Sequence, residues 1–433
     1  MRVILMAASV LLTSLPLEAD VHVTMDRYAC VAEPTSQTGL AVDFYGDVSN
    51  TGTSAVSLTC KLATSQPQEW LPPGVCIGVS CFPSDMEFTV ELPPNSQDEI
   101  HLTFYPYDSA GKGIYWFRFA HDAMADSARM EVLSGVPSLL VDDDDGDASE
   151  TFVERALPAD RAFLTWSQDL EPLASSDVAL LERIMWITGG SPAGCLSQDE
   201  ADVLTALLES GGKVLLSGQN ALEGEVGAEF GQGELGATVE AASVDSRHIQ
   251  GAAGTSFEIV SFDIAGGDGA DNQTSPDVLA ANGTAFRALR YGSGEVSAVA
   301  RVGLAGRRSL ACGFGVEACA DSTVLEGSLD LLLDWLDGLV AGDNAPRERP
   351  LALRVRPNPT GGVITVDLSA PEGGIARIWL TDLSGRLAGE LHHGVWSARP
   401  LRLPRLPRGT YLLCVETPTH AASQPLVILE ETR

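Results

Sequence analysis

Basic residues are scarce in this sequence. The chain of 433 residues has 27 lysines and arginines against 59 aspartates and glutamates, and its formal net charge at pH 7 is −32. The only lysines are Lys61, Lys112 and Lys213. Because a nucleic-acid-binding protein needs a basic face to meet the phosphates, this composition argues against a nucleic-acid partner. Divalent cations are the one class of partner that the acidity mildly favours.

The common spacings of metal-binding cysteines and histidines are also missing. No Cys-x-x-Cys or His-x-x-x-His pair occurs, which argues against a structural zinc site. Eight cysteines are nevertheless present, and in an exported protein most of them would meet an oxidising compartment, where disulfides persist. The close pairs Cys76 with Cys81 and Cys312 with Cys319 are candidate disulfides, and the sequence leaves the other four cysteines without an assigned partner.

Long apolar runs are absent except at the N-terminus. There, Met1-Arg2 precedes an apolar run from Val3 to Leu15, and Leu17-Glu18-Ala19 follows at the positions of a cleavage site. The run is shorter than the roughly 20 residues that span a bilayer, so residues 1–19 are typical of a secretory signal peptide and not of a membrane helix. We therefore expect an exported protein with no transmembrane segment in the mature chain.

The length of the chain and changes in its pattern predict several domains. Residues 20–135 consist of short alternating strands and turns, which favour an immunoglobulin-like β-sandwich. Residues 136–341 alternate between strand and helix, which predicts a central α/β doubly wound domain of the flavodoxin-like kind. Residues 342–352 are polar with two prolines and form a linker, and residues 353–433 return to short strands that predict a small β-sandwich.

One unit of the central segment is especially clear. The apolar strand from Ile184 to Thr188 is followed by a helix that begins at Ser197, where Ser197 and Glu200 have the spacing of a capping box. A second strand follows from Lys213 to Ser217. A further helix is expected from about Ser322 to Leu336.

The last segment resembles a known family. Three motifs occur in order: Arg356-Pro357-Asn358-Pro359, then Asp382-Leu-Ser-Gly385-Arg386, then Gly409-Thr-Tyr411, and an apolar final strand comes after them. Together they look like the C-terminal type A sorting domain of type IX secretion, over about residues 353–431. The motif residues that the resemblance carries over are Pro357, Asn358, Pro359, Asp382, Gly385, Arg386, Gly409 and Tyr411.

That resemblance implies a route and a place. The signal peptide would direct passage through the inner membrane of a Gram-negative bacterium, and the machinery of type IX secretion would recognise the sorting domain at the outer membrane. Family members are released or attached to the cell surface, so an outer-membrane surface or extracellular location is implied. Tails of the family often finish with a lysine, whereas this chain ends Leu429-Glu-Glu-Thr-Arg433.

The central segment resembles class I glutamine amidotransferase-like domains more weakly. Active members use a cysteine nucleophile at a strand-to-helix elbow together with a His-x-Glu element. Here Gly315-Val-Glu317 falls at the His-x-Glu position, and the elbow reads Ser217-Gly-Gln-Asn220. Glu317 is thus retained while the cysteine and the histidine are not, so an inactive domain is implied and no catalytic residue is assigned.

Sites in doubly wound folds gather at the carboxyl ends of the strands. Four such ends are expected along one edge: Asp142 to Asp145, Trp166-Ser167, Thr188 to Gly190 and Ser217 to Asn220. The acidic run does not fit an EF-hand, because positions 141 and 152 are Val and Phe. A looser oxygen-ligand site for Ca²⁺ would use Asp142, Asp144 and Asp147.

Two hypotheses of different classes follow. The first is a non-catalytic secreted or surface protein that binds an unknown glycan or protein through loops of the central domain. The second is a metal-dependent hydrolase, or an accessory module of a secreted hydrolase, that uses carboxylates such as Asp142 and Asp144.

Overall fold

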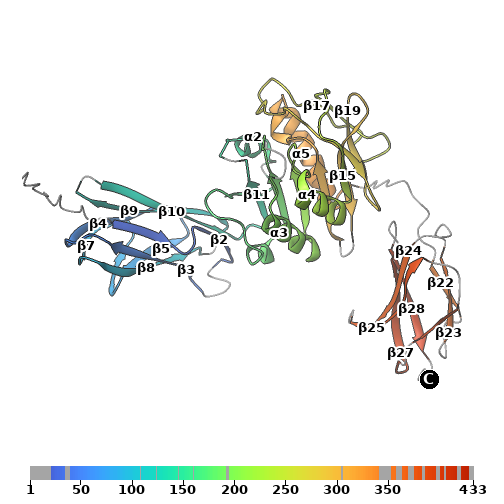
Figure 1. The fold of residues 1–433 in the computed structure, drawn as a ribbon, viewed down its shortest axis with the longest axis horizontal. Helices are drawn as coiled ribbons and strands as arrows, with labels where there is room; N and C mark the ends of the chain where they lie inside the picture. The colour runs from blue at the N-terminus through green and yellow to red at the C-terminus, as the bar shows by residue number, and fades with distance from the viewer. Residues whose placement is uncertain are drawn as a thin grey trace, which may run out of the picture. The chain divides into compact units, whose positions relative to one another are not determined.

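The computed structural model shows a mostly β protein, with six sheets among the residues that it describes (Figure 1). These residues are 21–34, 40–107, 109–122, 124–144, 146–158, 160–191, 195–303, 306–340, 353–356, 363–368, 375–382, 386–395, 400–403, 406–416 and 421–428. The expected signal peptide (1–19) and linker (342–352) lie outside them. Among the described helices, none combines the length and apolar character that a membrane span requires.

The chain divides into two compact units. The first runs to Val141 and also takes in Ala162–Arg183, and the second holds Asp142–Arg161 and the chain from Ile184 onward. Polar contacts hold residues 162–183 within the first unit. The Arg27 guanidinium lies 2.6 Å from the Asp177 carboxylate, and the Tyr28 amide donates to Glu171 Oε2 at 3.0 Å.

Ten strands open the first unit and form two five-stranded sheets, in the orders β1-β3-β8-β5-β6 and β2-β10-β9-β4-β7. They are β1 (Val21–Met25), β2 (Ala29–Ala32), β3 (Val42–Asn50), β4 (Val56–Ser65), β5 (Leu71–Ile77), β6 (Ser80–Pro83), β7 (Glu87–Leu92), β8 (Ser96–Tyr105), β9 (Gly111–His121) and β10 (Met124–Ser134). Side chains of both sheets share one core, in which the rings of Phe104 on β8 and Tyr115 on β9 lie 4.1 Å apart between centroids. This arrangement is a β-sandwich.

Alternation along the strands explains that core. In β4, the buried residues Val56, Leu58, Cys60 and Leu62 alternate with more exposed ones, because successive side chains of a strand point to opposite faces. The predicted disulfide between Cys76 and Cys81 is confirmed, and it joins directly opposed residues of β5 and β6. The first unit also contains β12 (Leu164–Ser167), the short helix η1 (Asp177–Leu180) and most of β11 (Ser138–Asp142), and β12 is the neighbour of β11.

Strands of the second unit follow the order β13-β14-β21-β20-β19-β16-β17, and β15 pairs separately with β18. Their bounds are β13 (Arg183–Ile187), β14 (Lys213–Ser217), β15 (Ala237–Ala241), β16 (His248–Gly251), β17 (Ser261–Asp263), β18 (Val278–Ala281), β19 (Phe286–Tyr291), β20 (Val296–Val302) and β21 (Arg308–Cys312). The helices are α2 (Glu150–Ala156), α3 (Gln198–Glu209), α4 (Gly224–Phe230), η2 (Gly231–Leu235), η4 (Val316–Ala318) and α5 (Ser322–Asp337).

The second unit departs from the expected doubly wound parallel sheet. Strands β14 and β21 are parallel, but β20 pairs antiparallel with both β21 and β19, and β16 pairs antiparallel with both β19 and β17. For β19, β20 and β21 the physical reason is the length of the connections: short ones join β19 to β20 and β20 to β21, whereas a parallel crossover needs a dozen residues or more, usually a helix. The sheet is therefore mixed.

The clearest sequence signals in this unit are confirmed. Helix α3 begins after Ser197, whose side chain accepts from the Glu200 amide at 3.3 Å while the Glu200 carboxylate accepts from the Ser197 amide at 2.7 Å. Its apolar face is buried, and Gly211 at φ +92° follows its end. The expected last helix is α5, where Asp321 caps the amides of Thr323 and Val324.

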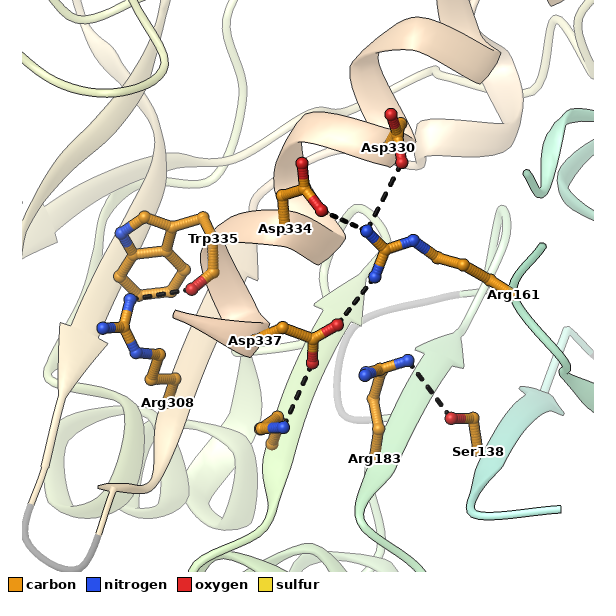
Figure 2. A network of polar contacts seen from close by, with 9 residues as sticks. Ser138, Arg161, Arg183, Arg308, Asp330, Asp334, Trp335 and Asp337 are labelled. Carbon is orange, nitrogen blue, oxygen red and sulfur yellow. Dashed lines mark hydrogen bonds and ion pairs between the residues drawn. The ribbon is translucent and has the colours of Figure 1, made fainter. Parts of the chain in front are cut away.

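A polar network anchors the outer side of α5 (Figure 2). The Arg161 guanidinium reaches three successive turns of this helix, pairing with Asp330, Asp334 and Asp337. The second oxygen of Asp337 lies 3.1 Å from Lys213 Nζ on β14. The helix is thereby tied by charge to two segments distant in sequence.

The C-terminal segment forms two further sheets, of order β22-β23-β26 and β25-β24-β27-β28. Their strands are β22 (Leu353–Arg356), β23 (Val363–Leu368), β24 (Ile375–Thr381), β25 (Leu387–Val395), β26 (Pro400–Arg402), β27 (Gly409–Glu416) and β28 (Ala421–Ile428). A core shared by both sheets includes Ile364, Leu380, Leu413 and Leu426. The expected small β-sandwich is what these strands build.

Candidate functional site

The ends of β13, β14 and β21 meet in a buried polar network of the second unit. The Thr188 amide donates to the Ser217 carbonyl at 2.9 Å, and Asn220 Nδ2 donates to the Ser191 carbonyl at 3.0 Å. The Val316 amide donates to Ser217 Oγ at 2.8 Å. Two of the expected strand ends thus come together as predicted, while the Trp166-Ser167 end belongs to the first unit.

The loop before β18 completes this network, and sequence reasoning missed it. Gln219 Oε1 accepts from the amides of Thr274 and Ser275, each at 2.8 Å. Gln273 Oε1 accepts from the Gly315 amide at 2.8 Å, and Asn272 Nδ2 donates to Glu317 Oε1 at 3.0 Å. The only signal in the sequence is the short polar run Asn272 to Ser275, and such a run is equally typical of an exposed loop.

Glu317, the retained glutamate, is fully buried. Burial raises the pKa of its carboxyl to about 7, and the nearby Asp144 acts in the same direction. A Cβ on Gly315 would overlap this carboxylate. Gly315 stands at the position where an amidotransferase would have its histidine, and the Glu317 carboxylate occupies the space that a side chain at this position would need.

The elbow residue Ser217 is also fully buried, and its hydroxyl is engaged by the Val316 amide and the Phe314 carbonyl. Cys312 and Cys319 are both free, so the predicted disulfide between them is wrong. Cys312 ends β21 within the core, and Cys319 Sγ points to the Asp321 carbonyl at 3.4 Å. Burial raises the pKa of the Cys312 thiol strongly, and a thiol that stays protonated is a poor nucleophile.

Asp277 is a second buried carboxyl of the network, only 1% exposed. Its Oδ2 accepts from the Asn220 amide at 2.9 Å, and Asn220 itself has a left-handed backbone at φ +63°. Burial, reinforced by the neighbouring Glu223 carboxyl, raises the pKa of Asp277 to about 7. This carboxyl holds the turn after β14 in place.

The acidic run gathers a different set of carboxylates from the expected one. Asp142 and Asp144 do come together, but the third member is Glu150 at the start of α2, and the ligand oxygens of all three lie within 4.8 Å of one another. Asp147 is exposed and only its amide takes part, donating to the Asp144 carbonyl at 3.4 Å. Asp147 is thus not part of this group, whereas Glu150 is, because it begins the helix that follows the loop.

Residues of the sorting motifs make local bonds in the C-terminal sandwich. The Asp382 amide donates to the Arg386 carbonyl at 2.9 Å, and the Arg386 amide donates to Asp382 Oδ1 at 3.0 Å. Gly409 opens β27, and Tyr411 Oη donates to the Pro407 carbonyl at 3.1 Å. Four motif residues lie outside the described residues: Pro357, Asn358, Pro359 and Gly385.

Comparison with known proteins identifies no family for this chain. No family model matches the sequence, and no curated protein matches it. One similar solved structure is AvmM, which catalyzes macrocyclization in alchivemycin A biosynthesis, at 9% identity over 27% of this chain and 89% of that chain, with a TM-score of 0.20. Two others are the N-terminal domain of PorA (14% identity, 26% and 94% covered, TM-score 0.18) and WR4, a C. elegans MSP family member (9%, 26% and 97%, TM-score 0.17). These likenesses are too low to carry an argument about function.

Proposed function

We propose that this chain is an exported surface protein that binds a ligand and catalyses no reaction, and that its C-terminal sandwich is the address read by type IX secretion. The first unit serves in this proposal as an immunoglobulin-like spacer. The second is a divergent relative of amidotransferase-like domains, an idea supported by the parallel pair β14 and β21 and by Glu317 just after β21.

Support for the address comes from the order of the motifs and from what their residues do locally. The Asp382 carboxylate closes its own turn, and the Tyr411 hydroxyl bonds back across four residues. Side-chain bonds of this kind fix tight turns in small β-sandwiches. Asp382 and Tyr411 thus help to shape a compact module, and the proposal requires no chemistry of them.

Support for binding without catalysis comes from the second unit. At the edge where an amidotransferase would act, the thiol is buried, the elbow carries a hydrogen-bonded serine, and the carboxylate of Glu317 fills the histidine position. Nucleophilic catalysis needs a nucleophile and a base within reach of each other and of substrate. The described residues offer no such set at this edge.

A groove elsewhere on the second unit is the best place for a ligand. Its volume is about 790 Å³, within the range of small-molecule sites. Alanines, glycines and Thr255 form much of its lining, with Phe286 beside them and two arginines, Arg287 and Arg290.

The two arginines face the same side because of irregular pairing in β19. Residues three apart in a regular strand point to opposite faces. Here the register between β19 and β20 shifts on both sides of Leu289, so Ala288 and Leu289 are both buried while Arg287 and Arg290 are both exposed. A β-bulge commonly re-aims side chains in this way.

Two unpaired arginines are unusual in a chain of net charge −32. Within the described part of the chain, neither guanidinium forms an ion pair or a side-chain hydrogen bond. Guanidinium groups bind carboxylates and sulfates through paired hydrogen bonds. We propose an oligosaccharide that carries acidic groups as the ligand, and this groove is the single observation on which the binding function rests.

The test measures binding of the purified full-length chain to matched neutral, carboxylated and sulfated oligosaccharides. We expect a preference for the acidic sugars that weakens with salt, and at least a tenfold loss in Arg287→Ala/Arg290→Ala. The matched control, Lys61→Ala/Arg118→Ala, removes the same charge from paired strands of the first unit and should bind normally. Equal binding of neutral sugars, equal loss in the control, or preference for an acidic peptide would overturn the proposal.

One observation favours the alternative of a metal-dependent hydrolase, namely the grouping of Asp142 and Asp144 with Glu150. A catalytic metal keeps an open coordination position toward its substrate. The three carboxylates are not among the residues that line the arginine groove. We therefore assign them a different task.

A further inference from the structure

Three carboxylates converge where β11 passes into α2. Asp142 ends the strand, Asp144 lies in the connecting loop, and Glu150 begins the helix, with one ligand oxygen of each within 4.8 Å of the others. Calcium binds oxygens at about 2.3–2.6 Å, so two of its ligands are at most about 5 Å apart. The spacing of the cluster suits a single ion.

The burial of Asp144 points to a ligand at this place. This residue is 3% exposed, and its Oδ2 accepts from the Ser149 amide at 2.9 Å. Its Oδ1 is buried without a hydrogen-bond partner among the described residues, and so is Glu150 Oε2. A carboxylate oxygen that is removed from water and forms no new hydrogen bond destabilises the folded state.

Protein cations do not supply the missing partner. Throughout the described ranges, no Lys, Arg or His forms an ion pair with Asp144 or Glu150. Glu317, a further fully buried carboxyl, has Oε2 in the same unpartnered condition and is close enough to act on Asp144 electrostatically. Asp144 and Glu150 thus have buried carboxylate oxygens that a bound positive ion would satisfy.

The backbone around the cluster is held firmly. The Asp143 amide donates to the Ile187 carbonyl at 2.9 Å, and Trp186 Nε1 donates to Asp143 Oδ2 at 2.8 Å. Gly189, at φ +54°, passes so close that a Cβ there would lie 2.7 Å from the Asp144 Cβ. Asp143 and Asp144 are thus held in place before any ion arrives, which favours binding.

We propose that Asp142, Asp144 and Glu150 hold one calcium ion that clamps the β11–α2 connection. Three carboxylate side chains supply the charge, and calcium accepts further oxygens from water or carbonyls to reach its usual six to eight ligands. The site differs from the one expected from sequence, since Glu150 takes the place of Asp147. It is independent of the proposed binding function.

The experiment uses the full-length chain after chelator treatment, with calcium added back. We expect saturable binding by calorimetry with a rise in melting temperature, and a much smaller rise with Mg²⁺, which demands a tighter octahedral shell. Glu150→Gln and Asp144→Asn should each weaken calcium binding at least tenfold. Asp147→Asn removes the same charge three residues from Glu150 and should bind like the parent.

Two variants guard against loss of folding. Glu150 is partly exposed, so Glu150→Gln is expected to fold even if Asp144→Asn does not. Absence of saturable calcium binding by the parent chain, equal protection by Mg²⁺, or an equal loss in Asp147→Asn would overturn the proposal.

Discussion

At the scale of single residues, the polar network at the ends of β13, β14 and β21 depends on contacts between residues that are not neighbours within one helix or strand. Glu317 was predictable as a retained acid, but its burial under Gly315 was not, because the overlap depends on how the chain turns after β21. The same holds for Gln273 and Asn272, whose partners lie more than 40 residues away. Sequence patterns report periodicity within an element and carry no signal for such bonds.

Gly315→Ala should destabilise the chain, because the new methyl group meets the Glu317 carboxylate. Overpacking of this kind costs about 1–3 kcal/mol in the free energy of unfolding, which urea denaturation measures. The control is Gly327→Ala, at an exposed position of α5 where a Cβ meets nothing within 4 Å. This helical replacement should raise stability by roughly 0.5–1 kcal/mol. Equal stability of Gly315→Ala and the parent would contradict the packing described.

Asp277 should make stability depend on pH. Its pKa rises from 3.8 to about 7 on folding, so between these values the folded chain holds a proton that the unfolded chain has released. The free energy of unfolding contributed by this group is therefore fully present below about pH 4, falls as pH rises, and levels off above about pH 7.

Asp277→Asn removes that proton while keeping an oxygen for the Asn220 amide. Denaturation midpoints measured between pH 4 and pH 8 should show a flatter decline in this variant, by up to about one proton per molecule. The exposed Asp245→Asn variant should follow the parent curve. An unchanged slope in Asp277→Asn would show that another group is responsible.

At the scale of elements, locally encoded helices were predictable and long-range pairing was not. Helix α3 begins where its capping box predicted, because a capping bond spans only two or three residues, and α5 lies where its apolar pattern predicted a helix. The antiparallel strands from β16 to β20 were missed, since short apolar runs fit a parallel or an antiparallel sheet equally well. The Arg161 network joins residues about 170 apart, and its charges alone could not reveal it.

Ser197→Ala tests the cap of α3. The change removes the hydroxyl that accepts from the Glu200 amide, and loss of such a cap costs about 1 kcal/mol in the free energy of unfolding. Gln198→Ala, one residue on, loses only an exposed bond to Asp202 and should stay within about 0.5 kcal/mol of the parent. Equal costs for the two would mean that the capping box contributes nothing.

At the scale of the whole molecule, we propose an exported chain with an address at its C-terminus. The disulfide between Cys76 and Cys81 agrees with an oxidising compartment. The charge of −32 agrees with the proposed surface protein, and the arginine groove is a local exception to it. Residues 353–433 contain three motifs in a fixed order, so the sequence alone predicts a sorting domain there. The pair of arginines in the groove could not be foreseen in the same way, because an irregular register in β19 places both on one side.

The most direct test follows the chain in a bacterium that has type IX secretion. Full-length protein and a version that ends at residue 341 are produced side by side, and both are quantified in the periplasm, on the cell surface and in the medium. We expect the full chain to reach the surface or the medium while the shortened chain stays in the periplasm. Export of both to the same extent, or retention of the full chain in the periplasm, would contradict the proposed address.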